Sequence, residues 1–238
     1  MDARKLQQLA AEHGITITED MLAQFERYYE LLIEWNEKMN LTGITEKKQV
    51  YEKHFYDSIT PSFYYDFTKV GSMIDVGSGA GFPGIPLKIC FPALSLTVLD
   101  SLKKRLLFLE EVCKELKLQD VTFLHSRAED AGQNLAYRET FDLATARAVA
   151  RLNVLAELCL PLVKPDGAFL VMKATGIEEE LNEAKKALKK LGGRTEKVES
   201  FQLPEEESDR NLIIVRKHGK TPCAYPRKAG TPANSPIL

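Results

Sequence analysis

The glycine-rich stretch at residues 72–86 constrains the fold of this chain more than any other part of its sequence. A short apolar run that includes one acid, Asp75, comes first, and a helix is expected over residues 85–91. Three glycines stand between them at alternate positions: Gly77, Gly79 and Gly81. A strand, a tight turn and a helix start leave bare backbone against which a ligand can lie, with the first helical N–H groups pointing at it. The stretch therefore predicts a ligand-binding turn.

The spacing of these glycines selects among the ligands that such turns bind. The dinucleotide fingerprint G-x-G-x-x-G would need a third glycine where Phe82 stands, and the G-K-[ST] end of a P-loop does not follow. The observed pattern, D-x-G-x-G-x-G from Asp75 to Gly81, is similar to motif I of S-adenosylmethionine-dependent methyltransferases. There the glycines admit the methionine part of the cofactor and the acid helps to fix it. A turn that binds nothing is disfavoured, because each glycine increases the entropy lost on folding.

Strands and helices are expected to alternate from about residue 70 onward. The expected strands are residues 72–76, 96–99, 121–124, 141–146, 168–173, 195–202 and 212–217. The expected helices are residues 85–91, 102–116, 154–163 and 177–191, with a turn at 165–167 before the fifth strand. This alternation predicts a doubly wound α/β fold, with a mostly parallel seven-stranded sheet and helices on both faces. Ligands bind such sheets at the carboxyl ends of the strands.

Residues 1–66 show helical patterns only. Apolar side chains from Leu22 to Met39 recur with helical spacing, and Thr18 is a suitable N-cap for that helix. We expect this segment to form a helical cap docked on a second unit, residues 67–238, which carries the α/β pattern. A chain of 238 residues is long enough for one large domain with such an appendage.

Composition disfavours several classes of protein. No run of about 18 apolar residues suggests a membrane span, and the first residues lack the apolar region of a signal peptide. The four cysteines are far apart and lack a nearby histidine pair, which indicates a reduced, cytoplasmic protein without zinc. We expect no metal and a monomer. The net charge is −2, so a nucleic-acid partner would need a local basic patch.

Polar residues end the second, third and fourth strands, at the edge where a ligand is expected. Asp100 stands about twenty residues beyond the glycines, where it could accept hydrogen bonds from ribose hydroxyls or cap the helix near Leu102. The third strand is followed by the polar stretch 125–130. Arg147 ends the fourth strand, either as a buried ion-paired residue or as a ligand contact, and the glycine turn beside it favours the contact.

Patterns typical of several other enzymes are missing from the sequence. No strand end carries the [NDS]-P-P-[YFW] tetrapeptide that methyltransferases of exocyclic base amines often have. No cysteine stands by the fourth strand for carbon-5 pyrimidine methylation. No serine, histidine and aspartate form an evident triad, and we interpret His54 and His125 as ordinary polar groups. A nucleophilic side chain is therefore not evident.

The C-terminal end of the chain is basic. No acidic residue follows Asp209, whereas six basic ones do: Arg210, Arg216, Lys217, Lys220, Arg227 and Lys228. Residues 225–232 add a tyrosine and prolines, so this tail is expected to be extended and exposed. Basic and aromatic side chains suit phosphate contacts and base stacking in RNA, although an ordinary solvated tail would share this composition.

Blocks of sequence along nearly the whole chain resemble a known family. They are Trp35-Asn36, Asn40-Leu41-Thr42, His54-Phe55-Tyr56-Asp57-Ser58, residues 75–87, Lys104-Arg105, Phe108-Leu109, Arg127-Ala128-Glu129, residues 146–149 and residues 225–232. On these blocks the chain is identified as a member of the bacterial small-subunit (16S) ribosomal RNA guanine-N7 methyltransferase G family, also called glucose-inhibited division protein B. One departure is Asn234, where the family often has a lysine, and this weakens one possible RNA contact.

The resemblance implies a fold, a cofactor and a site. The fold is the Rossmann-like class I methyltransferase fold, and the cofactor is S-adenosyl-L-methionine. The implied cofactor-binding residues are Asp75, Gly77, Gly79, Phe82, Asp100, Ala128, Glu129 and Arg147. Arg127 and Arg147 would lie nearest the chemistry, as the catalytic residues. The expected contacts to 16S ribosomal RNA or the small ribosomal subunit are Arg210, Arg216, Lys217, Arg227 and Lys228.

The implied reaction agrees with the lack of an evident nucleophile or general base in the sequence. Guanine N7 has a free lone pair and no proton, so its attack on a sulfonium methyl needs no general base and requires only in-line positioning. Two alternatives stay open: a nicotinamide-dependent oxidoreductase, which would share Asp100 and the fold, and a non-catalytic RNA- or ribosome-binding protein, which would share the basic tail. Phe82 at the third glycine position disfavours the first of these.

Overall fold

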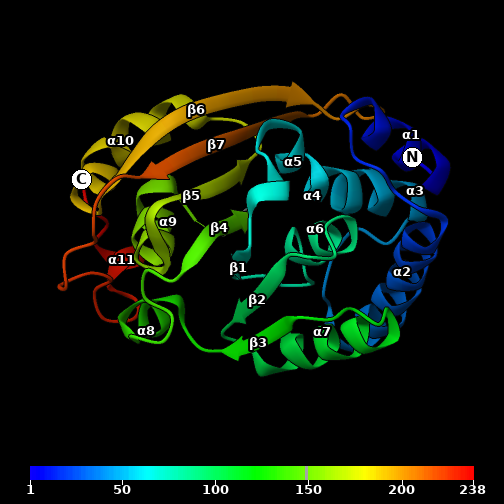
Figure 1. The fold of residues 1–238 in the computed structure, drawn as a ribbon, viewed down its shortest axis with the longest axis horizontal. Coiled ribbons are helices and arrows are strands. Elements are labelled where there is room, and N and C mark those ends of the chain that lie inside the picture. Colours follow the sequence, from blue (N-terminus) through cyan, green and yellow to red (C-terminus); the bar gives the residue numbers. More distant parts are fainter. Residues whose placement is uncertain (148–149) are drawn as a thin grey trace.

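The computed structural model describes residues 1–147 and 150–238, and its centre is a seven-stranded sheet (Figure 1). The strands are β1 (Ser72–Val76), β2 (Ser95–Asp100), β3 (Val121–His125), β4 (Phe141–Arg147), β5 (Val163–Lys173), β6 (Gly193–Gln202) and β7 (Asp209–Lys217). Their order is β3-β2-β1-β4-β5-β7-β6, and β7 is antiparallel to both of its neighbours. The expected α/β class and mostly parallel seven-stranded sheet are confirmed.

Helices cover both faces of the sheet. Those before it are α1 (Ala3–Glu12), α2 (Glu19–Met39), α3 (Lys47–Val50), the π-helical turn η1 (Tyr51–Tyr56), α4 (Asp57–Ile59), α5 (Pro61–Tyr64) and the short turn η2 (Phe67–Lys69). The others are α6 (Gly84–Cys90), α7 (Lys103–Glu115), α8 (Ala128–Gln133), α9 (Leu152–Cys159), η3 (Leu160–Leu162), α10 (Ile177–Lys190) and α11 (Thr231–Asn234). In Figure 1, α2, α6 and α7 lie on one side and α8, α9 and α10 on the other. No helix among the described residues is long and apolar enough to cross a membrane.

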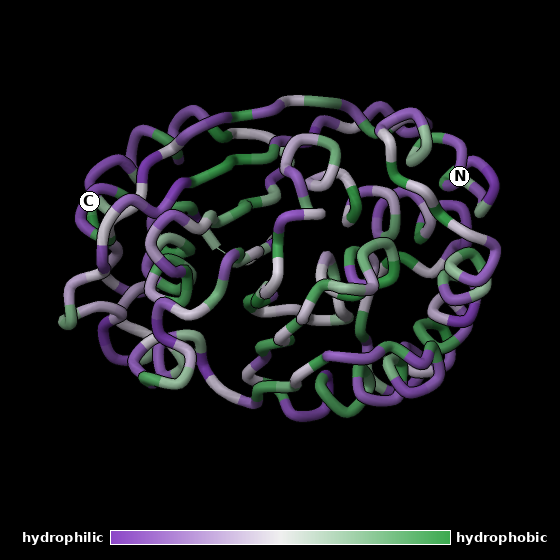
Figure 2. Tube along the Cα trace, viewed as in Figure 1, coloured by the Kyte–Doolittle hydropathy of each residue, from purple (hydrophilic) through white to green (hydrophobic). Residues whose placement is uncertain are grey.

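Two hydrophobic cores form because successive strand side chains point to opposite faces. Met73 and Ile74 are neighbours in β1 and both fully buried, but Met73 packs in the core with α2 and α7, and Ile74 in the core with α9 and α10. In β7, Leu212 belongs to the first core and Ile213 to the second. Figure 2 shows the consequence, with hydrophobic residues along the central strands and hydrophilic ones along the outer helices.

The N-terminal helices share one of these cores with the sheet. Leu6 of α1, Phe25 of α2 and Phe55 of η1 are fully buried in the same cluster as Leu170 of β5 and Ile214 of β7. Thr18 caps α2 as expected, since its side chain accepts a hydrogen bond from the N–H of the third helical residue. Residues 1–66 therefore pack against the sheet and share one hydrophobic core with it.

Two sequence-based expectations about the elements need correction, and one helix was not expected. The turn expected at residues 165–167 lies inside β5, which begins at Val163 and bulges, because Phe141 pairs with Val163 and Leu143 already pairs with Ala168. Helix α9 ends at Cys159, and the 3-10 turn η3, which contains a proline, replaces its expected last turn. Helix α8 has only six residues, too few to show helical periodicity, and was not expected.

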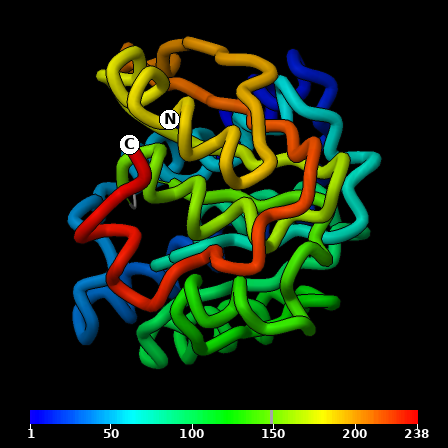
Figure 3. The backbone as a smooth tube through the Cα atoms, turned by 90° about the vertical axis from the view of Figure 1, so that its left-hand side faces the viewer, coloured from blue at the N-terminus to red at the C-terminus, as the bar shows by residue number. Residues whose placement is uncertain are grey.

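The C-terminal segment, expected to be extended and exposed, folds against the body of the protein. It is drawn red in Figure 3, and it contains the short helix α11. Pro226 and Pro232 are buried, and Arg138 donates to the carbonyl groups of Thr221, Pro222 and Tyr225. Three of the four cysteines are buried in the cores, and the fourth, Cys223 of this segment, is exposed.

Candidate functional site

A cavity of about 560 Å³ opens at the carboxyl edge of β1 to β4. It is lined by seven of the eight residues expected to bind cofactor and by one further expected catalytic residue: Gly77, Gly79, Phe82, Asp100, Ala128, Glu129, Arg147 and Arg127. These positions are distant in sequence, but the carboxyl ends of parallel strands share one edge of the sheet. Of the sequence block 146–149, the last two residues lie outside the described part of the chain.

The glycine turn after β1 forms one wall of this cavity. φ is 71°, 62° and 96° at Gly77, Gly79 and Gly81, in the left-handed region that side chains rarely adopt. A Cβ on Gly81 would also lie 2.5 Å from the Tyr28 hydroxyl oxygen. That hydroxyl, from α2, donates a hydrogen bond to the carbonyl of Ala80. An N-terminal helix therefore fixes the conformation of the turn.

Asp75 braces the turn from behind and does not line the cavity, which corrects the expectation that it contacts the cofactor. Its carboxylate accepts hydrogen bonds from the Ser78 hydroxyl at 2.5 Å, the Gly84 N–H at 3.0 Å and the Thr145 hydroxyl at 3.2 Å. Burial raises the pKa of Asp75, and these hydrogen bonds oppose the rise because they favour the ionised form. Asp75 thus joins β1, β4 and the start of α6 beneath the turn.

Asp100 lies between the glycine turn and α7; the N-cap of α7 is Leu102, and contact of Asp100 with ribose hydroxyls stays a prediction. Its Oδ2 accepts the N–H of Gly79 at 3.0 Å, and its Oδ1 accepts the N–H of Leu102 at 2.8 Å, just before α7. Arg105 Nη1 lies 3.4 Å from Oδ2. The residue is only 2% exposed, yet it borders the cavity. Asp100 therefore ties the glycine turn to the start of α7 and presents a carboxylate to the space between them.

Arg147 lies at the end of β4 and is held by the N-terminal helices. Its Nη1 donates to the Lys53 carbonyl at 3.2 Å and to Asp57 Oδ2 at 3.3 Å, and its guanidinium carbon lies 4.9 Å from the ring centroid of Phe82. Arg210 Nε also donates to Asp57, at 3.2 Å. Burial raises the pKa of Asp57, and the two guanidinium groups oppose that rise. Arg147 is thus both ion-paired and at the cavity.

Sequence reasoning missed the residues that the N-terminal segment contributes to the cavity: Leu41, Thr42 and His54. The His54 ring stacks on Phe82, with centroids 4.5 Å apart and planes 18° apart, and its Nε2 lies 2.8 Å from Thr42 Oγ1. Burial, together with the charge of Arg147, lowers the pKa of His54 to about 3, so the ring is neutral at pH 7. His54 belongs to the π-helical turn η1, a type of element frequent at functional sites. Its only sequence signal was its place in a family-like block.

The C-terminal segment contacts a residue that lines the same cavity. Arg127 is exposed and precedes α8, and Ala128 and Glu129 form the first turn of that helix. Oε1 of Glu129 accepts the backbone N–H of Gly230 at 2.9 Å. Sequence reasoning did not join these two positions, because no pattern in the chain relates residue 129 to residue 230.

Most residues expected to contact RNA are ion-paired in the structure. Arg210 pairs with Asp57, Arg216 Nε lies 2.7 Å from Glu196 Oε2, and Arg227 Nη2 lies 2.6 Å from Glu157 Oε2. Lys228 is exposed. These three of the five residues of the expected basic patch are therefore engaged in ion pairs within the protein.

Lys217 is fully buried and cannot meet RNA, which corrects that prediction. Its ammonium group donates to the Leu160 carbonyl at 2.6 Å and the Thr221 hydroxyl at 2.7 Å, and lies 3.2 Å from Glu139 Oε1. Burial lowers the pKa of Lys217 to about 8. The residue instead links β7 to the start of the C-terminal segment.

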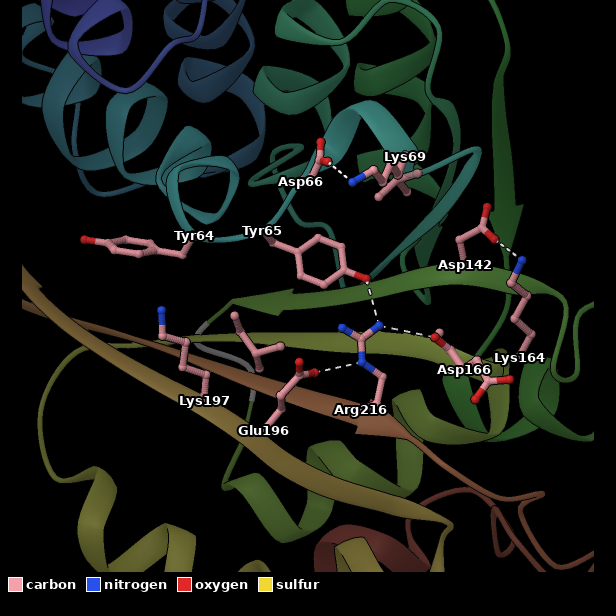
Figure 4. Close-up of a pocket in the computed structure, with 13 residues that line it drawn as sticks. Tyr64, Tyr65, Asp66, Lys69, Asp142, Lys164, Asp166, Glu196, Lys197 and Arg216 are labelled. Atoms are coloured by element: carbon pink, nitrogen blue, oxygen red, sulfur yellow. Dashed lines mark hydrogen bonds and ion pairs between the residues drawn. The ribbon is translucent and has the colours of Figure 1, made fainter.

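A second cavity of about 560 Å³ lies at the opposite edge of the sheet, near the starts of β4 and β5 (Figure 4). Six of its charged side chains form three ion pairs: Asp66 with Lys69, Asp142 with Lys164, and Glu196 with Arg216. The carboxyl ends of β1 to β4, where ligands bind in parallel sheets, lie at the other cavity. The described residues contain no cluster of three or more side chains suited to bind a metal ion. The cavity at the carboxyl edge is therefore the candidate site.

Comparison with known proteins gives a consistent result. A family model described as rRNA small subunit methyltransferase G matches residues 21–213. The chain is 57% identical over 238 residues to the ribosomal RNA small subunit methyltransferase G of Brevibacillus brevis, and the match covers all of both chains. It is 59% identical over 227 residues to the protein of the same name from Bacillus subtilis, covering 95% of each.

Solved structures show the same fold at much lower sequence identity. An S-adenosylmethionine-dependent O-methyltransferase from Thermotoga maritima matches with a TM-score of 0.53 and 17% identity, over 79% of this chain and 72% of that one. The mitomycin 7-O-methyltransferase MmcR matches with a TM-score of 0.56 and 17% identity, over 79% of this chain and 60% of that one. These likenesses concern the fold alone.

Proposed function

Because the chain belongs to the rRNA small subunit methyltransferase G family, we propose that it transfers a methyl group from S-adenosylmethionine to N7 of a guanine in 16S ribosomal RNA. The observation that supports this most directly is the cavity that gathers the glycine turn, Asp100, the start of α8 and Arg147 at one sheet edge. The relatives in Brevibacillus and Bacillus carry the enzyme name, and they match 100% and 95% of this chain.

The residues of the cavity suit S-adenosylmethionine. The left-handed glycines leave backbone uncovered for the methionine end, and Asp100 offers carboxylate oxygens to ribose hydroxyls. Ala128 and Glu129, at the next strand end, would border the adenine. When bound, the cofactor supplies the methyl group on an electrophilic sulfonium. Asp75, buried beneath the turn, would keep the glycine backbone in shape.

The chain supplies positioning and no general base to the proposed reaction. N7 of guanine carries no proton, so no side chain has to remove one. His54 stays neutral because burial lowers its pKa to about 3, which avoids a second cation beside a base that becomes positive. Arg147, fixed by Asp57 and Lys53, would hold O6 or a phosphate and so orient the guanine. Arg127, exposed at the cavity, is the other candidate for contact with RNA.

The RNA is proposed to approach from the open side of this cavity. Arg127 is exposed at the cavity and Lys228 is exposed on the C-terminal segment, whereas Arg210, Arg216 and Arg227 are ion-paired. We propose that the substrate is 16S ribosomal RNA, free or within the small subunit, that the protein acts in the cytoplasm, and that it does so as a monomer. The dehydrogenase and non-catalytic alternatives lose their support, because the family is one of methyltransferases.

A labelling experiment tests the proposal. The protein is incubated with S-adenosylmethionine labelled in the methyl group and with 16S RNA or small subunits from a strain that lacks the modification, and the modified base is mapped. We expect label at N7 of one guanine. Absence of label from both substrates, or label at another atom, would refute the proposed reaction.

A further inference from the structure

We propose that the C-terminal segment, residues 221–237, positions Glu129 at the cofactor site, and that Arg227 holds the segment there. The proposal rests on S-adenosylmethionine being the cofactor. Arg227 is then a positioning residue for the cofactor site. The basic tail had first indicated that it contacts RNA.

The segment touches the site through one hydrogen bond. The backbone N–H of Gly230 donates to Glu129 Oε1 at 2.9 Å, and Glu129 lines the cavity. Gly230 has φ of 85° and forms the N-cap of α11, so its N–H direction is set by the folding of that helix. A carboxylate held by a backbone donor keeps one orientation. The position of the segment therefore decides how Glu129 faces the cavity.

Arg227 fastens the segment to α9. Its Nε lies 2.9 Å from Oε1 of Glu157, its Nη2 lies 2.6 Å from Oε2, and its backbone N–H donates to Oε1 at 2.8 Å. Nη2 also donates to the Ser235 carbonyl at 2.9 Å, beyond α11. The Glu157 side chain is 1% exposed. A guanidinium bound by both oxygens of a buried carboxylate is committed to that partner and is poorly available to a phosphate.

The shape of α8 supports close docking independently of these hydrogen bonds. A Cβ on Gly132 would lie 2.8 Å from Pro226 Cγ and 3.2 Å from Pro161 Cβ. Nη1 of Arg138 bridges the two elements, donating to the Gly132 carbonyl at 2.8 Å and the Tyr225 carbonyl at 2.7 Å. The segment lies so close to α8 that a side chain at residue 132 would push it away.

Two substitutions disturb the docking from opposite sides. Arg227→Gln weakens the bond to Glu157, and Gly132→Ala introduces a methyl group beneath Pro226. Neither residue lines the cavity. We expect each to raise the Kd for S-adenosylmethionine, measured by calorimetry without RNA, about tenfold, the effect of losing a hydrogen bond to a charged group. The KM for RNA, at saturating cofactor, should not change. Lys228→Gln, a neighbouring exposed residue, should leave the Kd for cofactor unchanged.

The opposite pattern would overturn the proposal. If Arg227→Gln raised the KM for RNA and left the Kd for S-adenosylmethionine unchanged, Arg227 would be an RNA contact. If Glu157 does not tolerate an uncharged partner, the double variant Glu157→Gln with Arg227→Gln leaves no buried charge unpaired and is measured in the same way.

A measurement on the unaltered protein completes the test. Coupling between two sites is reciprocal, so S-adenosylmethionine should slow hydrogen exchange at the amides of residues 221–237. Unchanged exchange in this segment, in protein saturated with cofactor, would overturn the proposal. The Kd for S-adenosylmethionine and the hydrogen exchange are measured without RNA, so failure of the proposed reaction, which would prevent only the measurement of KM, would be recognised separately.

Discussion

Arg147 forms an ion pair with a buried carboxylate and also borders the cavity. Its side chain is 15% exposed and paired with the buried Asp57, yet it borders the cavity at the end of β4. The sequence offered these as alternatives, a structural ion pair or a ligand contact. The ion pair is present, with its carboxylate from α4, and the contact with ligand stays a prediction for a side chain that borders the cavity.

Replacement of Arg147 should separate positioning from stability. We expect Arg147→Ala to lower the rate of methylation at saturating substrates by about 100-fold, because a misplaced guanine loses in-line geometry. The fold should persist, since Asp57 keeps Arg210 as a partner at 3.2 Å. Arg147→Lys should also be strongly impaired, because lysine lacks the planar fork. Single-turnover rates and circular dichroism provide the measurements, and an active, folded Arg147→Ala protein would contradict the role.

Buried, neutral His54 should make the protein sensitive to acid. Its pKa in the folded protein is about 3, below the ordinary value near 6.5, so protons bind the unfolded chain first as the pH falls. The stability linked to this residue is complete above pH 6.5 and is lost between pH 6.5 and pH 3.

Urea unfolding measures this loss. From pH 7.5 to pH 5.5, the free energy of unfolding should fall by about 1.4 kcal/mol more in the wild-type protein than in His54→Gln. The variant serves as the control, because both proteins share every other titrating group. Equal pH slopes would show that His54 is not buried in its neutral form.

At the scale of elements, the strand–turn–helix unit around the glycines needs a turn without side chains. We expect Gly81→Ala to lower the free energy of unfolding by about 2 kcal/mol or more and to abolish cofactor binding, because φ is 96° and the added methyl would meet Tyr28. Gly43→Ala is the matched control, since a Cβ there meets nothing within 4 Å. Thermal unfolding and calorimetry with S-adenosylmethionine compare the two variants, and a Gly81→Ala protein as stable as Gly43→Ala would be evidence against the constraint.

The elements that the sequence predicted are those with strong local signals. The strand–turn–helix unit and Asp100 were visible because glycine spacing and apolar periodicity are local properties. The contributions of His54 and Gly230 were not visible, because His54 lines the cavity, and Gly230 contacts the lining residue Glu129, only through folding of segments distant in the chain. The prediction of a basic surface failed for a related reason. Lys217 and Arg227 lie in a stretch without acidic residues, but each pairs with a glutamate far upstream in the chain, Glu139 and Glu157.

At the scale of the whole molecule, the shared core implies one cooperative unit. Residues 67–238 alone would expose Met73, Leu96 and Leu143, which pack in the same core as the N-terminal helices, and would lack Thr42 and His54 at the cavity. We therefore expect this fragment to aggregate or to unfold without a cooperative transition, in contrast to the single transition of the full chain. Calorimetry of both proteins decides the matter, and an independently folded fragment would show that the boundary at residue 66 separates true domains.

The cysteines of this chain make it suited to spectroscopy without engineering. Cys90, Cys113 and Cys159 are buried, whereas Cys223 is exposed on the C-terminal segment, where its carbonyl oxygen accepts a hydrogen bond from Gln133 of α8. Burial raises the pKa of Cys90 and Cys113 to about 12, so these thiols are also poor nucleophiles. A maleimide dye added to the native protein should therefore attach at one position, and its fluorescence would report in real time whether the end of the chain stays seated.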